Sequence, residues 1–175
     1  FALCFGLRQP KIYISTKTGT FRSGGLISLS SVEDPAVNIR SYNASGQADI
    51  FLYQADEAAL IRNLLRDKDN NQINKKVDIS QLQLIASQQA FVSTSGETKI
   101  TLPLSQSGIW LLRVSLSGIT ADNFIIRSDN GVLVKEGNQE YIFWAQNFRT
   151  KRSASEGSLK LYSLLNKQTE LVSTN

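Results

Sequence analysis

The sequence has 175 residues, a formal net charge of +4, 41% hydrophobic residues and 19% charged residues. A chain of this length and composition can bury the core of one ordinary domain or two small ones, which argues against intrinsic disorder. It contains no histidine and a single cysteine, Cys4, which excludes a Ser-His-Asp triad, a Cys-His dyad, a histidine-based zinc site and an internal disulfide.

Residues 1–10 begin with a short apolar stretch and end with polar residues and a proline, and the chain does not start with Met. We interpret residues 1–10 as the remnant of a signal peptide, with a first β-strand as the alternative. Cys4 suggests a lipoprotein anchor, but Leu3 is larger than the residue that usually precedes such a cysteine, so lipidation or removal of Cys4 stays open. The missing Met indicates a processed product or a fragment. A single cysteine suits a bacterial periplasm better than a disulfide-rich extracellular domain.

Short apolar runs separated by Gly, Ser, Asn and Asp recur along the chain and predict β-strands. The alternation is clear where Ile27 and Leu29 are interleaved with Ser28 and Ser30. The spacing of the runs predicts a mainly β fold of tandem antiparallel β-sandwich domains rather than alternating β-α units. The predicted strands cover residues 11–15, 25–31, 37–42, 48–53, 97–102, 109–116, 123–127, 131–135, 140–146 and 158–164.

One short α-helix is predicted over residues 56–66. Asp56 suits the N-cap position, and Glu57 suits the positive end of the helix dipole. An apolar stripe at helical spacing is expected to pack on the core, and it consists of Leu60, Ile61, Leu64 and Leu65. Residues 78–91 hold no single period, so helix and strand stay open there.

A turn with the sequence Ser-Asp-Asn-Gly begins at Ser128, and a new series of strands follows it. We therefore expect three parts: the signal-peptide remnant at 1–10, a β-sandwich domain at 11–127, and the truncated start of a second β-sandwich domain at 128–175. The last part is too short for the roughly seven strands of a usual sandwich.

Two triplets copy signatures of penicillin-binding proteins and serine β-lactamases, namely Lys17-Thr18-Gly19 and Ser128-Asp129-Asn130. Those enzymes also need a Ser-x-x-Lys motif. No serine in this chain has a lysine three positions later. We therefore interpret both triplets as turns.

Residues 67–78 begin like a calcium-binding loop, but the sixth position, which should be glycine, is Gln72. We interpret this segment as a polar loop after the helix. The acidic pairs Glu33-Asp34 and Asp67-Asp69 are expected in loops as ordinary surface charges. The sequence thus offers no catalytic, cofactor-binding or metal-ligating residue, and we expect no cofactor.

The basic residues are spread along the chain, which argues against nucleic acid as a partner. Residues 148–152 hold the densest basic cluster, which we interpret as a solvated loop that resembles a processing-protease site. No run is long enough for a transmembrane helix, so membrane anchoring is expected only through an N-terminal signal or lipid. Four aromatic residues in apolar strands are expected in the core: Trp110, Tyr141, Phe143 and Trp144.

Two stretches together resemble the alpha-2-macroglobulin family, particularly its bacterial members. In the first, the strand at 11–15 precedes Phe21 and Gly24, which match a Phe-x-Pro-Gly-Glu motif, whereas Ser23 and Gly25 replace its Pro and Glu. The strand that precedes the helix and the Pro-to-Trp segment before the next strand are also similar to family segments, at residues 50–55 and 102–111.

The second stretch is more specific. Residues 125–135 resemble the opening of the next macroglobulin-like domain, and residues 141–150 lead toward a further strand at 159–162. Three residues stand where the family has Gly, Pro and Gly, and they are Lys151, Ser153 and Glu156.

The resemblance implies tandem macroglobulin-like, Ig- or fibronectin-like β-sandwich domains and a protease-trapping role in the periplasm or outside the cell. It implies target proteases as partners, bound through the full-length protein, and contacts with neighbouring domains of the same chain. The family's thioester motif, Cys-Gly-Glu-Gln, has no match here and Cys4 is not its cysteine, so no functional residue is carried over.

The leading hypothesis is a non-catalytic scaffold portion of an alpha-2-macroglobulin-like endopeptidase inhibitor. The alternative is a cell-surface adhesion or carbohydrate-binding β-sandwich module, which would need outward-facing aromatic residues as a platform. An enzyme is not favoured, because no nucleophile can be paired with a base.

Overall fold

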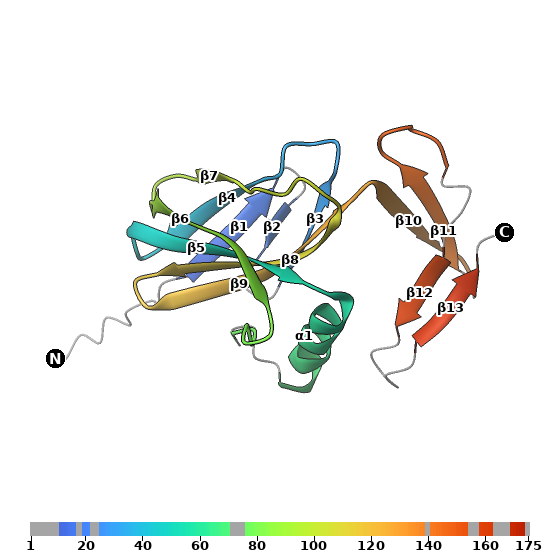
Figure 1. The fold of residues 1–175 in the computed structure, drawn as a ribbon, viewed down its shortest axis with the longest axis horizontal. Helices are drawn as coiled ribbons and strands as arrows, with labels where there is room; N and C mark the ends of the chain where they lie inside the picture. The colour runs from blue at the N-terminus through green and yellow to red at the C-terminus, as the bar shows by residue number, and fades with distance from the viewer. Residues whose placement is uncertain are drawn as a thin grey trace.

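Two β-sheets packed face to face form the larger part of the structure (Figure 1). The computed structural model describes residues 11–16, 19–21, 25–70, 76–138, 141–153, 158–162 and 169–173. The four-stranded sheet has the order β2-β1-β4-β7, formed by Gly19–Phe21, Lys11–Thr16, Ala36–Tyr42 and Thr98–Thr101. The five-stranded sheet has the order β3-β9-β8-β5-β6, formed by Leu26–Ser30, Ile119–Ser128, Gly108–Leu116, Gly46–Ala55 and Gln83–Val92. The predicted mainly β sandwich fold is confirmed.

The strands of both sheets pair antiparallel with one exception, at the edge strand β3. It runs parallel to β9, with Ile27 opposite Ile125 and Leu29 opposite Arg127. The prediction of an antiparallel arrangement is wrong for this pair. The alternation of apolar residues in 25–31 fixes which face of the strand is buried, but it carries no information on the direction of the neighbouring strand.

Alternating apolar side chains from both sheets fill the space between them. The largest fully buried members of this cluster are Ile14, Ile27, Val37, Ile39, Ile50, Val92, Leu102, Leu112, Val114 and Ile125. Burying one such side chain contributes about 1.5–3 kcal/mol. The continuous apolar run in β8 has a separate cause, since Leu111 faces a second cluster on the outer side of the five-stranded sheet.

The predicted helix is confirmed as α1, Glu57–Asn70, and it lies on the outer side of the five-stranded sheet (Figure 1). Asp56 is its N-cap, because its Oδ1 accepts a hydrogen bond of 2.7 Å from the Ala59 amide. Leu60 is buried and Ile61 is half-buried, while the side chains of Leu64 and Leu65 are outside the described part. The helix continues through Asp67 and Asp69, so their predicted place in a loop is wrong. Neither Gly nor Pro interrupts residues 57–70, and the helix therefore continues.

The segment left open in the sequence, residues 78–91, forms a turn and then strand β6. β6 pairs with β5 in an antiparallel register that is interrupted by a bulge between Leu52 and Tyr53. Ile85 is the extra residue of this bulge, since Leu84 and Ala86 pair with consecutive residues of β5. The bulge shifts the alternation of apolar residues by one position, which explains why no single period was found.

Strand β9 begins four residues earlier than predicted because a tight turn joins it to β8. Ser117 and Gly118 both have positive φ, 49° and 79°, as in the two-residue turns that match the twist of a hairpin. The register follows, with Leu116 opposite Ile119 and Arg113 opposite Asp122.

Two hairpins follow the sandwich and are set apart from it in Figure 1. The first joins β10 to β11, Asn130–Glu136 and Tyr141–Asn147, and the second joins β12 to β13, Ser158–Tyr162 and Thr169–Ser173. β13 was not predicted. The signal-peptide interpretation of residues 1–10 lies outside the described residues. Within those residues, no helix is long and apolar enough to cross a membrane.

Candidate functional site

An ion pair on the outer face of the five-stranded sheet fixes the segment that follows α1. Arg113 and Asp122 face each other across β8 and β9, and Nε and Nη2 of Arg113 each donate a 2.7 Å hydrogen bond to one carboxylate oxygen of Asp122. The Val77 carbonyl accepts a third bond from Arg113, and the Val77 amide donates to Asp122, both at 2.7 Å. The hydrogen bond and the charge of Asp122 raise the pKa of Arg113 against the opposing effect of burial.

Sequence reasoning missed this pair, although the chain holds a signal for it. The turn at Ser117-Gly118 places Leu116 opposite Ile119. Counting three residues back along β8 and three forward along β9 then places Arg113 opposite Asp122. The side chain of Arg113 is 13% exposed and that of Asp122 is 1% exposed. Val77 packs against the apolar cluster between α1 and the outer face of the five-stranded sheet. Because the charges and hydrogen bonds are used within the fold, we interpret the pair as structural.

A second arginine, Arg127, holds the loops at one end of the sandwich. It is buried, and its guanidinium donates to the carbonyls of Ser31 at 2.9 Å, of Glu33 at 3.3 Å and of Leu104. These carbonyls belong to the loop after β3 and the loop after β7. Arg127 therefore ties the two sheets together where β9 leaves the sandwich.

Asp129 lies at the junction between the sandwich and the first hairpin, between the ends of β9 and β10. Its carboxylate accepts hydrogen bonds from the hydroxyls of Ser31 and Ser107, the latter at 3.3 Å, and from Arg149 Nη2 at 3.2 Å. Its carbonyl accepts a 2.7 Å bond from the Phe148 amide. The bonds from Ser31 and Arg149 lower the pKa of Asp129. Asp129 thus contacts the sandwich through two serines and the hairpin through residues 148 and 149.

We expect Asp129→Asn to loosen this junction, because a neutral amide cannot form the ion pair with Arg149. The pKa of Asp129 in the folded state lies below its unfolded value of about 3.9. The ionised carboxylate therefore stabilises the fold above the unfolded pKa, and this stabilisation is lost as the pH falls through the folded-state pKa. The measurement is NMR titration of the Asp129 carboxyl carbon and exchange of the Phe148 amide at neutral pH. We expect a midpoint below the ordinary range and faster exchange in the variant, whereas Asp34→Asn leaves the exchange unchanged. A titration midpoint of Asp129 at or above about 3.9, the ordinary pKa of an aspartate, would contradict the proposed role of Asp129 at the junction.

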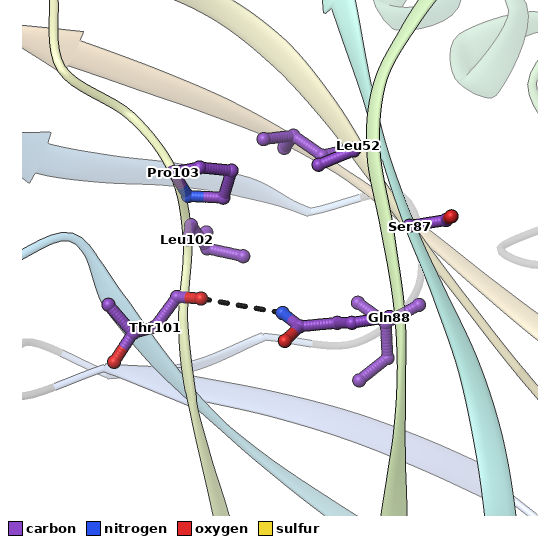
Figure 2. A pocket seen from close by; sticks show the side chains of 8 residues that line it. Leu52, Ser87, Gln88, Thr101, Leu102 and Pro103 are labelled. Atoms are coloured by element: carbon purple, nitrogen blue, oxygen red, sulfur yellow. Dashed lines mark hydrogen bonds between the residues drawn. The ribbon is translucent and has the colours of Figure 1, made fainter.

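A groove opens between the edges of the two sheets, and Figure 2 shows it from close by. It has a volume of about 290 Å³ and separates β6 from the segment that follows β7. Leu52 and Leu102 give it an apolar lining, and Gln88 reaches across it to donate a 3.4 Å hydrogen bond to the Thr101 carbonyl. No charged residue lines the groove, so it suits an uncharged, mainly apolar occupant.

Of the aromatic residues predicted to lie in the core, Trp110 is buried and Trp144 is exposed. Trp110 is 9% exposed and belongs to the core between the sheets, as predicted. Trp144 is 56% exposed on β11, where its Nε1 donates a 3.2 Å hydrogen bond to Ser153, so its predicted burial is wrong. β11 pairs only with β10 among the described strands, and the exposure of Trp144 shows that its side of this hairpin is open to solvent. Phe143 is half-buried, and the side chain of Tyr141 is outside the described part.

The remaining candidate residues do not come together. Glu33 and Asp34 lie exposed in the loop after β3, Asp78 lies exposed before β6, and residues 148–152 form an exposed turn, as expected for a solvated loop. Ser128 ends β9, Asp129 lies between the strands and Asn130 begins β10. In the other triplet, Gly19 begins β2, while residues 17 and 18 are outside the described part. Within the described ranges, no group of three or more Asp, Glu, Cys or His residues is placed to hold a metal ion.

Two solved structures have a fold similar to this chain. A crystal structure of native alpha-2-macroglobulin from Escherichia coli spanning domains NIE-MG1 is 14% identical with a TM-score of 0.66, and the match covers 95% of this chain and 83% of that one. A second structure of that protein, spanning domains MG0-NIE-MG1, is 13% identical with a TM-score of 0.67, and the match covers 95% of this chain and 54% of that one. No protein-family model and no curated protein matches the sequence. The likeness confirms the predicted alpha-2-macroglobulin-like fold.

Proposed function

We propose that this chain is a non-catalytic scaffold portion of an alpha-2-macroglobulin-like endopeptidase inhibitor that traps proteases. The observation that carries the proposal is the extent of the structural likeness, because one match of two-domain length covers 95% of the chain. The match therefore includes residues of both the sandwich and the hairpins. An unrelated β-sandwich module would match over the sandwich alone.

The domain boundary belongs to the same proposal. We place the sandwich domain at 11–127 and the start of the next domain at 128–175, after a signal-peptide remnant at 1–10. The order of the solved domains supports a correspondence of the first unit to NIE and of the second to MG1. The full-length protein would act outside the cytoplasm, in the periplasm or the extracellular space, with target proteases and neighbouring domains of its own chain as partners.

The chemistry of the buried polar residues supports a scaffold rather than an enzyme. Arg113, Asp122 and Arg127 are all engaged with partners inside the fold. The chain has no histidine to act as a general base. Asp129 lies beside two serine hydroxyls, but its lowered pKa makes it a poor base. These residues therefore hold loops and junctions in place.

The proposal predicts that the chain alone does not inhibit proteases. The described residues form one sandwich and two hairpins, which cannot enclose a protease, so we expect trapping to be a property of the full-length inhibitor. The test mixes the purified chain with trypsin and with an elastase and follows cleavage of a small peptide substrate and a large protein substrate. A trap blocks the large substrate and spares the small one. We expect both substrates to be cleaved at the rate of protease alone.

Two results contradict this proposal. Selective loss of cleavage of the large substrate would show that the chain is itself a trap. Stoichiometric loss of cleavage of both substrates would indicate an inhibitory loop that binds the protease active site. The exposed turn at residues 148–152 would then be the first segment to replace, with Arg149→Ala as the initial variant.

A further inference from the structure

Strand β6 is an open edge of the five-stranded sheet. Among the described strands it pairs only with β5. Its sequence, QLIASQQAFV, holds no charged residue and no proline. Proteins usually protect an edge strand from pairing with another chain by charges, prolines, bulges or a covering segment. Of these features, the described residues show only the bulge at Ile85, which leaves residues 86–92 as a regular edge.

The outward direction of the backbone follows from one hydrogen bond. The hydroxyl of Thr98 donates a 2.8 Å bond to the Phe91 carbonyl, and Thr98 begins β7 in the four-stranded sheet, so this carbonyl is bonded to a group outside β5. Because successive residues of a strand turn their backbone groups to opposite sides, Gln89 and Ser87 face the same way as Phe91. Their amides and carbonyls are directed away from β5 and are available to a new strand.

The edge also carries a large share of the exposed apolar surface of the sandwich. Leu84, Ile85 and Phe91 are 49%, 42% and 58% exposed. Ile85 and Phe91 lie equally far from Gln88 in opposite directions along the strand. An antiparallel copy of β6 centred on Gln88 therefore brings each Phe91 next to the bulge at Ile85 of the other copy.

We propose that β6 pairs with β6 of a second copy of this chain, antiparallel and around a two-fold axis at Gln88. This register places Ser87 opposite Gln89 of the second copy, and the reverse, and both residues direct their backbone groups outward. Each such pair exchanges two main-chain hydrogen bonds. The two five-stranded sheets become continuous, which is strand addition at a free edge.

The side chains on the inner side of the edge fit this register. Ala86 lies opposite Ala90 of the second copy, and the two Gln88 residues lie opposite each other. These side chains of the second copy enter beside the groove lined by Leu52 and Leu102, which holds no charged residue. Although the chain carries a net charge of +4, no like charges meet across the paired strands. This self-complementarity is the reason to infer a second copy.

The two-fold position of residue 88 gives a sharp test by sedimentation velocity over a range of protein concentrations. We expect the weight-average mass of the wild-type chain to rise toward that of a dimer with concentration. Gln88→Lys and Gln88→Glu each place like charges opposite each other, so each variant alone is expected to stay monomeric. An equimolar mixture of the two is expected to recover the dimer, because an ammonium group then faces a carboxylate across the two-fold axis.

Thermal unfolding of each variant shows whether its fold is intact, and Gln106→Lys is the matched control. Gln106 is exposed in the loop after β7 and is not part of β6, so this variant is expected to dimerise like the wild type. A wild-type chain that stays monomeric at every concentration overturns the proposal. Dimers of a folded Gln88→Lys variant, or a mixture that stays monomeric while both variants are folded, also overturn it.

Discussion

Replacing Asp122 with alanine is expected to lower the free energy of unfolding by about 3–5 kcal/mol. The substitution leaves the Arg113 guanidinium without its carboxylate in a site where the arginine side chain is 13% exposed. It also removes the acceptor of the Val77 amide, which loosens the segment after α1 from the sheet. Urea unfolding followed by far-UV circular dichroism measures the change.

A double variant and an exposed control separate the ion pair from general effects of mutation. Arg113→Met combined with Asp122→Leu replaces both charges with apolar groups and is expected to cost less than Asp122→Ala alone, since no unpaired charge remains. Asp34→Ala removes an exposed carboxylate and is expected to change the stability by no more than about 0.5 kcal/mol. A loss below about 1 kcal/mol for Asp122→Ala would show that the pair does not hold this face together.

Replacing Trp110 with alanine is expected to cost about 3–5 kcal/mol, the range for a large aromatic side chain in a core. Trp110 is buried between the sheets and lies against Gly108, where an added Cβ would come within 2.8 Å of the indole ring. The indole ring therefore packs directly on the Gly108 backbone, and its loss would leave a cavity there. Thermal unfolding monitored by circular dichroism measures the effect.

Trp144→Ala is the matched control for Trp110→Ala. Its side chain is 56% exposed on the first hairpin, so its loss is expected to change the unfolding of the sandwich by less than about 1 kcal/mol. The comparison also bears on the adhesion alternative, which requires aromatic residues on the surface. A Trp110→Ala variant that keeps its stability would place this ring outside the core and favour that alternative.

The sequence predicts the outline of the sandwich because each buried strand carries a strong local signal. In β4, Val37 and Ile39 alternate with polar residues, and the α1 N-cap is recognisable from Asp56 alone. Alternation marks the buried face of a strand, yet it does not identify the neighbouring strand or its direction. The parallel pairing of β3 with β9 depends on contacts between residues about 98 positions apart, such as Ile27 and Ile125, and no local pattern encodes it.

The polar residues of the candidate site were harder to predict than the core. Arg113 and Asp122 are separated by a turn of two residues with positive φ, and only that turn fixes their register. The burial of Trp144 was inferred from the apolar run around it, which cannot show whether a further strand covers the face. The sequence did not identify β6 as a strand, because the bulge at Ile85 interrupts the alternation of apolar residues.

We propose that residues 11–127 form a self-supporting scaffold domain, with the first hairpin attached to it through Asp129. Hydrogen exchange of the full chain, followed by NMR or mass spectrometry, tests this most directly. An isolated two-stranded hairpin is marginally stable, and β10 pairs only with β11 among the described strands. We predict the slowest exchange in β5, β8 and β9, and exchange at least about tenfold faster in β10 and β11, which corresponds to about 1.4 kcal/mol or more of local stability. Equal protection of the two regions, lost together in one cooperative unfolding step, would contradict the account.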